Sequence, residues 1–512
     1  MKRITNILVL LIIAMQLSAQ STYNVTPLFS PDLTGTARFV GMGGAMSALG
    51  GDISTMSTNP AGIGIYRSAD INASASLGTL NTTADFLGSS LSKDKFLASF
   101  DNVGVVFAMD TYEECQSLKF INIGFNYSRR NNFRKDFAMN GWYADDAGET
   151  LYSQQFQIQD LYDNSLPDLG AITSASYRNP RYPWLPLLAA DAGVLNTDGG
   201  IRYLPTDANF YSEDRGGVNL VDFNLSCNIN DRLYLGMTIG AQYVDYERYS
   251  MYGEYDNQGV IYTLENWQKT RGEGLDVKFG AIVRPFEYSP LRLGLAFHLP
   301  TFYNLTDYSS AYMAGPDESD GGYRDMYTAW PEAYGNDYIV DYTVRSPWRM
   351  NLSAGYTFAD ILALNAEYEL VDYSSAKMEY ADGYDMPDMN DEFDCNMKSS
   401  HIFRVGAEVK LDKNLSMRCG YNHISSAFRE DAWKYISPTS ANTATDYTNT
   451  KDTNIFTFGL GYRGKSSYID IAYQCLLQDA DFYTYTDPDV YLPATKVSDF
   501  RNKIVLTLGT RF

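Results

Sequence analysis

Residues 456–463 read Phe-Thr-Phe-Gly-Leu-Gly-Tyr-Arg, and this stretch decides the fold class. Every second residue, from Phe456 to Tyr462, is large and apolar, whereas the residues between them are threonine, glycine or arginine. Side chains of a β-strand point alternately to its two faces, so the stretch predicts a strand with one apolar and one polar face. A polar face that carries glycine and charge indicates the wet lumen of a transmembrane barrel rather than a soluble sandwich.

The same alternation recurs along the chain, most clearly at 291–299, 350–358, 401–411 and 414–423. Charged residues of both signs take the inward parity, where they can pair in a wet interior instead of facing lipid alone. These residues are Glu367, Glu369, Arg404, Glu408, Arg418, Arg463 and Asp470.

Fourteen such segments follow one another between residues 69 and 512, and an even number is typical of bacterial barrels. Short links such as Asn230-Asp231 alternate with long acidic and aromatic connections, which predicts short periplasmic turns and long extracellular loops. The long loops are expected at 129–217, 304–343, 374–398 and 425–451.

The connection 129–217 is long enough to be functional or disordered. It contains a possible helix near 149–162 and an apolar patch that either receives an apolar ligand or forms a packed lid. The patch consists of Trp184, Leu185, Leu187 and Leu188.

The N-terminus has the features of a secretory signal peptide over residues 1–20. Lys2 and Arg3 precede an apolar run from Ile7 to Leu17, and the small-residue stretch ends at Gln20. A membrane anchor is the alternative, but a spanning helix needs ~20 apolar residues and this run is shorter. We therefore expect a protein of the outer membrane of a Gram-negative bacterium.

Composition excludes several other classes. The formal net charge of −22 makes nucleic acid an improbable partner, because DNA and RNA bind through their phosphates. The five cysteines are scattered without a C-x-x-C pair, so we interpret Cys227, Cys419 and Cys475 as small apolar residues facing lipid. The acidic stretch 385–394 could bind calcium, but its spacing is not that of an EF-hand, and a solvated loop is favoured. No cofactor and no metal site are predicted.

Residues 33–66 lack strand alternation and are rich in glycine, alanine, serine and threonine. Small residues permit tight turns and close packing, so the segment predicts short helices and turns that fit inside a narrow lumen. Gly41, Gly43 and Gly44 superficially match a dinucleotide-binding fingerprint, but the βαβ unit that such a site needs is missing.

In these features the chain resembles the FadL/TodX family of outer-membrane transporters for long-chain fatty acids and other hydrophobic molecules. The resemblance rests on the Gly-Met-Gly-Gly-Ala stretch at 41–45, on Asn-Pro-Ala-Gly at 59–62, and on several strand segments up to the C-terminus. It covers nearly the whole chain after the signal peptide. It implies an all-β transmembrane fold, a 14-stranded antiparallel outer-membrane β-barrel, with an N-terminal hatch over 21–68 that plugs the lumen and a barrel over 69–512.

The resemblance also implies roles for particular residues. Asn59, Pro60, Ala61 and Gly62 would anchor the hatch against the inner wall as a substrate gate, near a kink in the third strand. We expect that kink or bulge at Gly124. An inert plug that only supports folding is the alternative, and the sequence leaves the choice open.

The resulting expectation is passive uptake of hydrophobic molecules such as long-chain fatty acids, through hatch movement and lateral exit through the barrel wall. The surrounding outer-membrane lipids, and the barrel-assembly machinery acting through Phe512, are the other expected partners. A surface receptor is a second hypothesis, and an outer-membrane lipase using His298 or His423 with a serine is a third. No catalytic constellation of that kind stands in the sequence, so we expect no enzyme.

Overall fold

The computed structural model describes residues 21–111, 117–145, 148–166, 171–179, 181–196, 199–317, 325–334, 338–437, 440–486 and 491–512. Nineteen strand segments within these ranges form one sheet. They are β1 (Asp70–Phe86), β2 (Ser89–Asp110), β3 (Leu118–Asn132), β4 (Lys135–Trp142), β5 (Asp207–Ile229), β6 (Leu233–Asp256), β7 (Gly259–Val283), β8 (Arg292–His298), β9 (Phe302–Asp317), β10 (Asp325–Ala329), β11 (Tyr338–Arg345), β12 (Arg349–Phe358), β13 (Leu362–Asp372), β14 (Lys377–Tyr380), β15 (Ser399–Lys410), β16 (Leu415–Ile424), β17 (Tyr447–Arg463), β18 (Ser467–Tyr483) and β19 (Thr495–Arg511).

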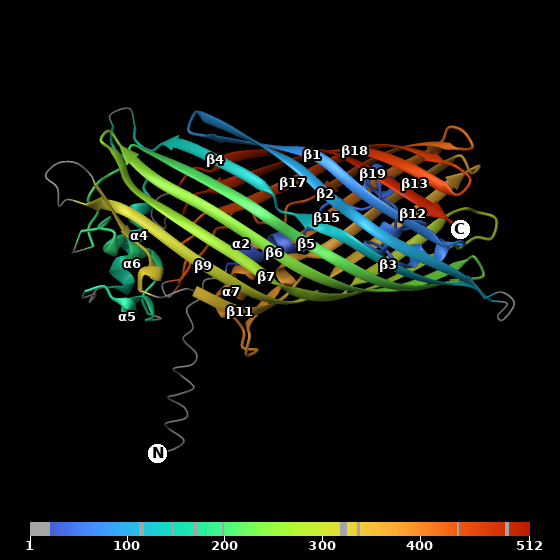
Figure 1. Ribbon diagram of the computed structural model, residues 1–512, viewed down its shortest axis with the longest axis horizontal. Helices are drawn as coiled ribbons and strands as arrows, with labels where there is room; N and C mark the ends of the chain where they lie inside the picture. The colour runs from blue at the N-terminus through green and yellow to red at the C-terminus, as the bar shows by residue number, and fades with distance from the viewer. Residues whose placement is uncertain are drawn as a thin grey trace, which may run out of the picture.

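The sheet closes on itself as an antiparallel barrel (Figure 1), because β19 pairs with β1 from Asp70↔Arg511 to Asp85↔Lys496. Four crossings of the wall consist of two successive segments each, namely β3/β4, β8/β9, β11/β12 and β13/β14. The segment β10 pairs only with β9. The described residues therefore cross the wall fourteen times, as the sequence predicts.

The two faces of the wall follow the expected parity. Large apolar side chains such as Phe458 (44% exposed) and Leu508 (56% exposed) point outward, while Thr457 and Thr507 point inward and are buried. An apolar outer face around a closed barrel is the arrangement that satisfies every backbone hydrogen bond in lipid. The protein is thus located in the outer membrane. No helix among the described residues is long and apolar enough to cross a membrane.

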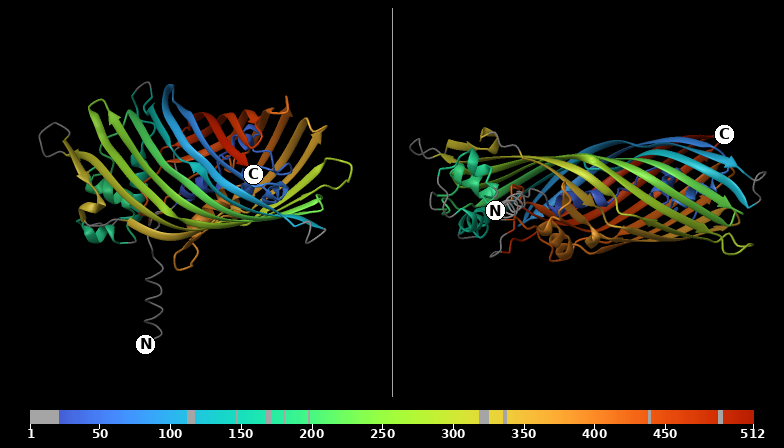
Figure 2. Two further views of the ribbon diagram at one scale, coloured as in Figure 1. Left: turned by 45° about the vertical axis from the view of Figure 1, so that its right-hand side comes forward. Right: turned by 90° about the horizontal axis from the view of Figure 1, so that it is seen from below.

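The helices lie inside the barrel and at one of its ends. The hatch, residues 21–68, contains α2 (Thr22–Phe29), α3 (Ala37–Gly41) and the short 3-10 helices η1 (Ile53–Ser57) and η2 (Pro60–Ile65). Figure 2 shows this segment enclosed by the strands. The other helices are α4 (Gln154–Ser165), α5 (Ser174–Tyr177), α6 (Trp184–Asp191), η3 (Pro331–Tyr334), η4 (Tyr373–Ser375) and α7 (Pro387–Asn396).

The expected helix near 149–162 is α4, and α4, α5 and α6 gather at the end opposite the C-terminus (Figure 1). The apolar patch of the connection 129–217 is a packed lid rather than an open site. Trp184 is 3% exposed, and Leu187 and Leu188 are fully buried.

Several loops are shorter than the sequence predicts, because strands extend into them. The irregular part of the expected loop 129–217 lies between β4 and β5, and β9 and β11 occupy much of 304–343. The region 374–398 contains β14 and α7, and β17 already begins at Tyr447. Alternation fails as a signal here because a strand that rises above the membrane no longer needs an apolar outer face. Upper β5, for example, turns Glu213 and Arg215 outward beside Tyr211.

Candidate functional site

The Asn-Pro-Ala-Gly motif of the hatch sits in a cradle of wall glycines. Asn59 is fully buried and caps η2, since its Oδ1 accepts a hydrogen bond from Ala61 N at 3.1 Å. Its Nδ2 donates to the carbonyl oxygens of Ser47 at 3.0 Å and of Ala281 on β7 at 3.3 Å. The Pro60 carbonyl oxygen accepts a hydrogen bond from Ser226 Oγ of β5 at 3.0 Å. The motif is therefore bonded both to the hatch and to the wall.

Glycines on the inner face of β6, β7 and β8 make this close approach possible. A Cβ atom added to Gly280 would lie 2.0 Å from Asn59 Oδ1, and one added to Gly236 would lie 2.4 Å from the Pro60 carbonyl carbon. A Cβ on Gly294 would lie 3.0 Å from Asn59 Nδ2. Any larger residue at these positions would push the motif away from the wall.

A second cradle, on the inner face of β15, β16 and β17, receives the Gly-Met-Gly-Gly-Ala stretch. Gly43 and Gly44 have φ of +66° and +79°, a backbone conformation that L residues rarely adopt, so the tight turn after α3 requires glycine. A Cβ on Gly420 would lie 2.2 Å from Gly43 N, and one on Gly406 would lie 2.5 Å from the Met42 carbonyl oxygen. Both motifs are thus matched by wall glycines.

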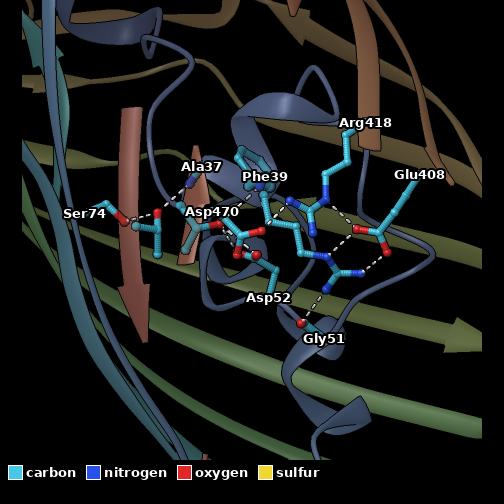
Figure 3. Close-up of polar contacts among 11 residues, drawn as sticks. Ala37, Phe39, Gly51, Asp52, Ser74, Glu408, Arg418 and Asp470 are labelled. Carbon is cyan, nitrogen blue, oxygen red and sulfur yellow. Dashed lines mark hydrogen bonds and ion pairs between the residues drawn. The ribbon is translucent and has the colours of Figure 1, made fainter. Parts of the chain in front are cut away.

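A buried charge network joins the hatch to the wall beside the second cradle (Figure 3). The Arg38 guanidinium of α3 pairs with both carboxylate oxygens of Glu408, at 2.9 and 3.1 Å. Arg418 donates from Nε to the same carboxylate at 2.6 Å and from Nη1 to Asp470. Arg38 also donates to the Gly51 carbonyl oxygen at 3.0 Å. Since both guanidiniums contact Glu408 and Arg418 also contacts Asp470, two wall carboxylates balance one hatch charge and one wall charge.

The N-terminal helix α2 is bonded to the loops at the opposite side of the hatch. Glu392 of α7 accepts hydrogen bonds from the backbone N and the Oγ1 of Thr22, at 3.1 and 2.7 Å. The Tyr23 ring stacks on Phe428, with ring centroids 5.3 Å apart and an angle of 15° between the planes. Burial raises the pKa of the Glu392 carboxyl. The position of α2 therefore depends on loops 373–397 and 425–446.

The wall has a break between β2 and β3/β4. β2 and β3 pair from Asn102↔Ser128 to Asp110↔Phe120. The rest of β2 pairs with β1 alone. Both strands have irregular register at the point of parting. Asp101 is skipped in the pairing of β2 with β1, and β3 shifts register between Arg129 and Asn131. Bulges bend strands, and here β3/β4 leaves the edge of β2.

Side chains rather than backbone bonds cross this break. Lys95 of β2 donates from Nζ to Asp136 of β4 at 2.7 Å and to Glu213 of β5 at 3.0 Å. On the inner side, the lower end of the break is covered by residues 30–35, which we call the hatch linker. Asp32 N donates to the Arg130 carbonyl oxygen at 3.1 Å, and Thr34 Oγ1 donates to that of Arg129 at 2.8 Å. The hatch linker thus provides partners to backbone groups at the bulge of β3.

Two cavities adjoin the hatch linker. One, of about 110 Å³, is lined by the hatch linker, Arg130, Lys278 and His298 among others, and a second, of about 360 Å³, lies between α2 and residues of the β16–β17 connection. The Nε of Arg130 is buried and has no hydrogen-bond partner among the described residues. The first cavity is therefore lined by charges of both signs, with Asp276 and Glu369 beside Arg130 and Lys278.

Comparison with known proteins gives relatives in structure only. No protein-family model matches the chain, and no curated protein matches it. Among solved structures, a Pseudomonas aeruginosa FadL homologue is 12% identical, with a TM-score of 0.54 over 94% of this chain and 99% of that one. The Pseudomonas putida toluene transporter TodX is 10% identical, with a TM-score of 0.51 over the same shares of the two chains.

The chain has the FadL/TodX fold. This likeness establishes the fold and not the ligand, because the sequence identity is low. Within the FadL/TodX fold, the two glycine-rich hatch motifs occupy the positions described above, one in each cradle. Whether Asn59 to Gly62 form a gate stays a prediction.

Gly124 lies in regular register between Val106 of β2 and Asn224 of β5. A Cβ at this position would lie 2.1 Å from Met56 Cε, so its lack of a side chain makes room for η1. The register shift that bends β3 lies five to seven residues further on, at Arg129/Asn131. The sequence feature that coincides with this register shift is the polar run 128–132, which interrupts the apolar outer face of the strand.

The histidines of the lipase hypothesis have structural partners. His298 Nε2 lies 2.9 Å from the Thr58 carbonyl oxygen of the hatch, and His423 Nδ1 lies 3.1 Å from Asn454 Oδ1. His401 is exposed on the outer face and bonds to the Tyr368 hydroxyl at 2.8 Å. The two candidate histidines thus contribute to hatch and wall contacts.

Proposed function

We propose that this protein is an outer-membrane channel for the passive uptake of hydrophobic small molecules, with long-chain fatty acids as the leading substrate class. The substrate enters from the extracellular side, displaces the hatch linker and leaves sideways through the wall. The observation that carries the proposal is the break between β2 and β3/β4, covered from inside by the hatch linker.

The physical argument concerns the solubility of the substrate. An apolar solute gains no free energy by crossing a wet lumen, because burial away from water is what favours its transfer. Exit at the lower end of the break, where Phe100 faces outward next to the paired part of β2, delivers it directly into the hydrocarbon layer. A continuous barrel prevents this, since each broken ladder hydrogen bond leaves a polar group unsatisfied in lipid. Where β2 and β3/β4 already part, no ladder has to be broken.

The hatch linker couples the plug to this opening. It supplies hydrogen bonds to the carbonyl oxygens of Arg129 and Arg130, and Asn131 Nδ2 donates to the Ser30 carbonyl oxygen at 2.6 Å. Movement of the linker would release all three contacts and uncover the break. Arg130, which lines the cavity beside the linker, suits a carboxylate headgroup, since a guanidinium binds carboxylates strongly. An anionic amphiphile would therefore bind in this cavity through its headgroup.

The test is a chemical crosslink across the break. Lys95→Cys with Asp136→Cys would be joined by a bifunctional thiol reagent, and uptake of a labelled long-chain fatty acid measured in a host lacking its own transporter. A matched control joins Asp481→Cys to Lys496→Cys, an ion pair at 2.8 Å across the intact β18–β19 ladder. We expect the first crosslink to stop uptake and the second to leave it unchanged. Equal uptake with both crosslinks would reject lateral exit at this break.

A receptor is the second candidate, favoured by the extracellular cap of α4, α5 and α6. The cap packs against the upper strands in one apolar core, which includes Ile158, Trp184 and Phe210. A channel needs a passage rather than a structured cap of this kind. A protein whose cap is removed should keep uptake if it is a channel, and should lose partner binding but not barrel folding if it is a receptor.

A further inference from the structure

A cup of about 610 Å³ opens at the outer end of the molecule, apart from the break and the first cavity. Three segments distant in sequence build it. They are α4, residues 430–436 of the β16–β17 connection, and residues 485–486 and 491–492 with the upper ends of β17 and β18. The volume lies within the ~300–1,000 Å³ common for small-molecule sites.

Aromatic rings are the main feature of the cup. Side chains alternate along 431–436, so that Trp433 and Tyr435 point outward and are 49% and 40% exposed. Their rings meet edge to face at 6.0 Å, and Tyr447 stacks on Tyr483 at 4.8 Å. Tyr491 is 81% exposed. This cluster lies beyond the membrane-facing part of the strands, so lipid does not cover it, and exposed aromatic clusters in water mark binding surfaces.

The charges at the cup determine which ligands it suits. Asp160, Glu430 and Asp431 are exposed at the cup. Its lysine, Lys434, is 2% exposed, and its Nζ donates to the carbonyl oxygens of Ala444 and Asp446. Among its described lining residues, the cup therefore presents carboxylates and no free cation. Anionic amphiphiles would be repelled, so the cup is not a second site for a fatty acid.

We propose that the cup binds a neutral or amino-sugar oligosaccharide. A sugar ring has an apolar C–H face and a polar hydroxyl edge. The exposed faces of Trp433 and Tyr435 fit the first, while carboxylates and tyrosine hydroxyls accept hydrogen bonds from the second, and bonds to ionised acceptors are the stronger ones. A hydrocarbon would leave the same polar groups without partners, which is unfavourable. The proposal does not depend on transport.

The test uses the full-length protein in an amine-oxide detergent, because sugar-based detergents would compete. Binding of tetrasaccharides is measured by calorimetry with N-acetylglucosamine, glucosamine and sulfated series, alongside choline and decanoate. A delipidated polysaccharide from the outer membrane of the expression host distinguishes a lipid-linked glycan from a free one. Trp433→Ala and Tyr435→Ala are the test variants, and both side chains are exposed enough for folding to be retained. Tyr384→Ala, a 66% exposed tyrosine outside the cup, is the matched control.

We expect the neutral and amino series to bind and the sulfated series not to bind. Each cup variant should weaken binding about tenfold, which corresponds to the loss of one stacking contact of about 1.4 kcal/mol. The control variant should leave binding unchanged. Binding of choline or decanoate in place of the sugars, preference for sulfated glycans, binding of no glycan at all, or equal binding by Trp433→Ala would overturn the proposal. Uptake is not measured, so failure of the channel would leave this result intact.

Discussion

Gly280→Ala should undock the hatch without altering any hatch residue. The new Cβ would lie 2.0 Å from Asn59 Oδ1 and 2.9 Å from Ala61 N, distances that real Cβ atoms essentially never show. The Asn59 side chain must therefore move. It would then leave at least two buried groups without partners, the Ser47 carbonyl oxygen and the Ala61 N–H. Each unsatisfied group costs about 1–3 kcal/mol, so docking of the hatch should weaken by about 2–6 kcal/mol.

The matched control is Gly459→Ala, another inward wall glycine. Its Cβ would be no closer than 3.3 Å to any atom, the nearest being Gly41 Cα, and the neighbour can yield by a few tenths of an ångström. Heat-shift gels would first show that both barrels fold. Hydrogen exchange of residues 47–65 and ion conductance in planar bilayers would then be measured. We expect fast exchange and open-channel events only for Gly280→Ala. Equal exchange in the two variants would refute the argument that the glycine cradle holds the motif.

Three further predictions concern buried charges. Glu408→Gln should destabilise hatch docking by about 3–5 kcal/mol, because two guanidiniums lose their shared carboxylate. Hydrogen exchange in α3 should become faster, and exchange as slow as in the wild type would contradict the prediction. Glu392→Ala should speed exchange in the first turn of α2, with exposed Asp394→Ala as the control that should not. Burial lowers the pKa of Lys434 from 10.5 to about 8. The unfolded loop thus holds this proton at pH values where the folded loop has lost it, so protease resistance of 425–446 should rise with pH between these values. Lys434→Met should remove that rise, and an unchanged pH profile would reject the assignment.

Alternation of apolar and polar residues was enough to predict the barrel, its fourteen crossings and the end that carries the long loops. It worked because lipid imposes one rule on every outward position. Above the membrane, the outward positions of β5, β9 and β11 no longer need to be apolar. The sequence pattern therefore predicts loops for these parts of the strands. The small-residue composition of 33–66 indicated a plug for a comparable reason, since only compact turns fit a closed lumen.

The inward glycines show the limit of reading one strand at a time. Gly236, Gly280 and Gly420 stand out in the sequence only as residues of the polar parity. Their purpose is to let Pro60, Asn59 and Gly43 approach the wall, and this depends on contacts between residues far apart in the chain. No local pattern records which hatch atom a wall glycine will face.

The sequence by itself determined the class of environment of each residue, outward in lipid, inward in the lumen, or in the plug, because that depends on local periodicity and composition. Only the tertiary structure decided where the wall parts, which carboxylate holds Arg38, and which loops form the aromatic cup. The break at Asp101 and Arg129/Asn131 depends on the register of both β2 and β3. Register and long-range pairing are properties of the closed barrel, and they are set by the sum of contacts around it rather than by any one segment.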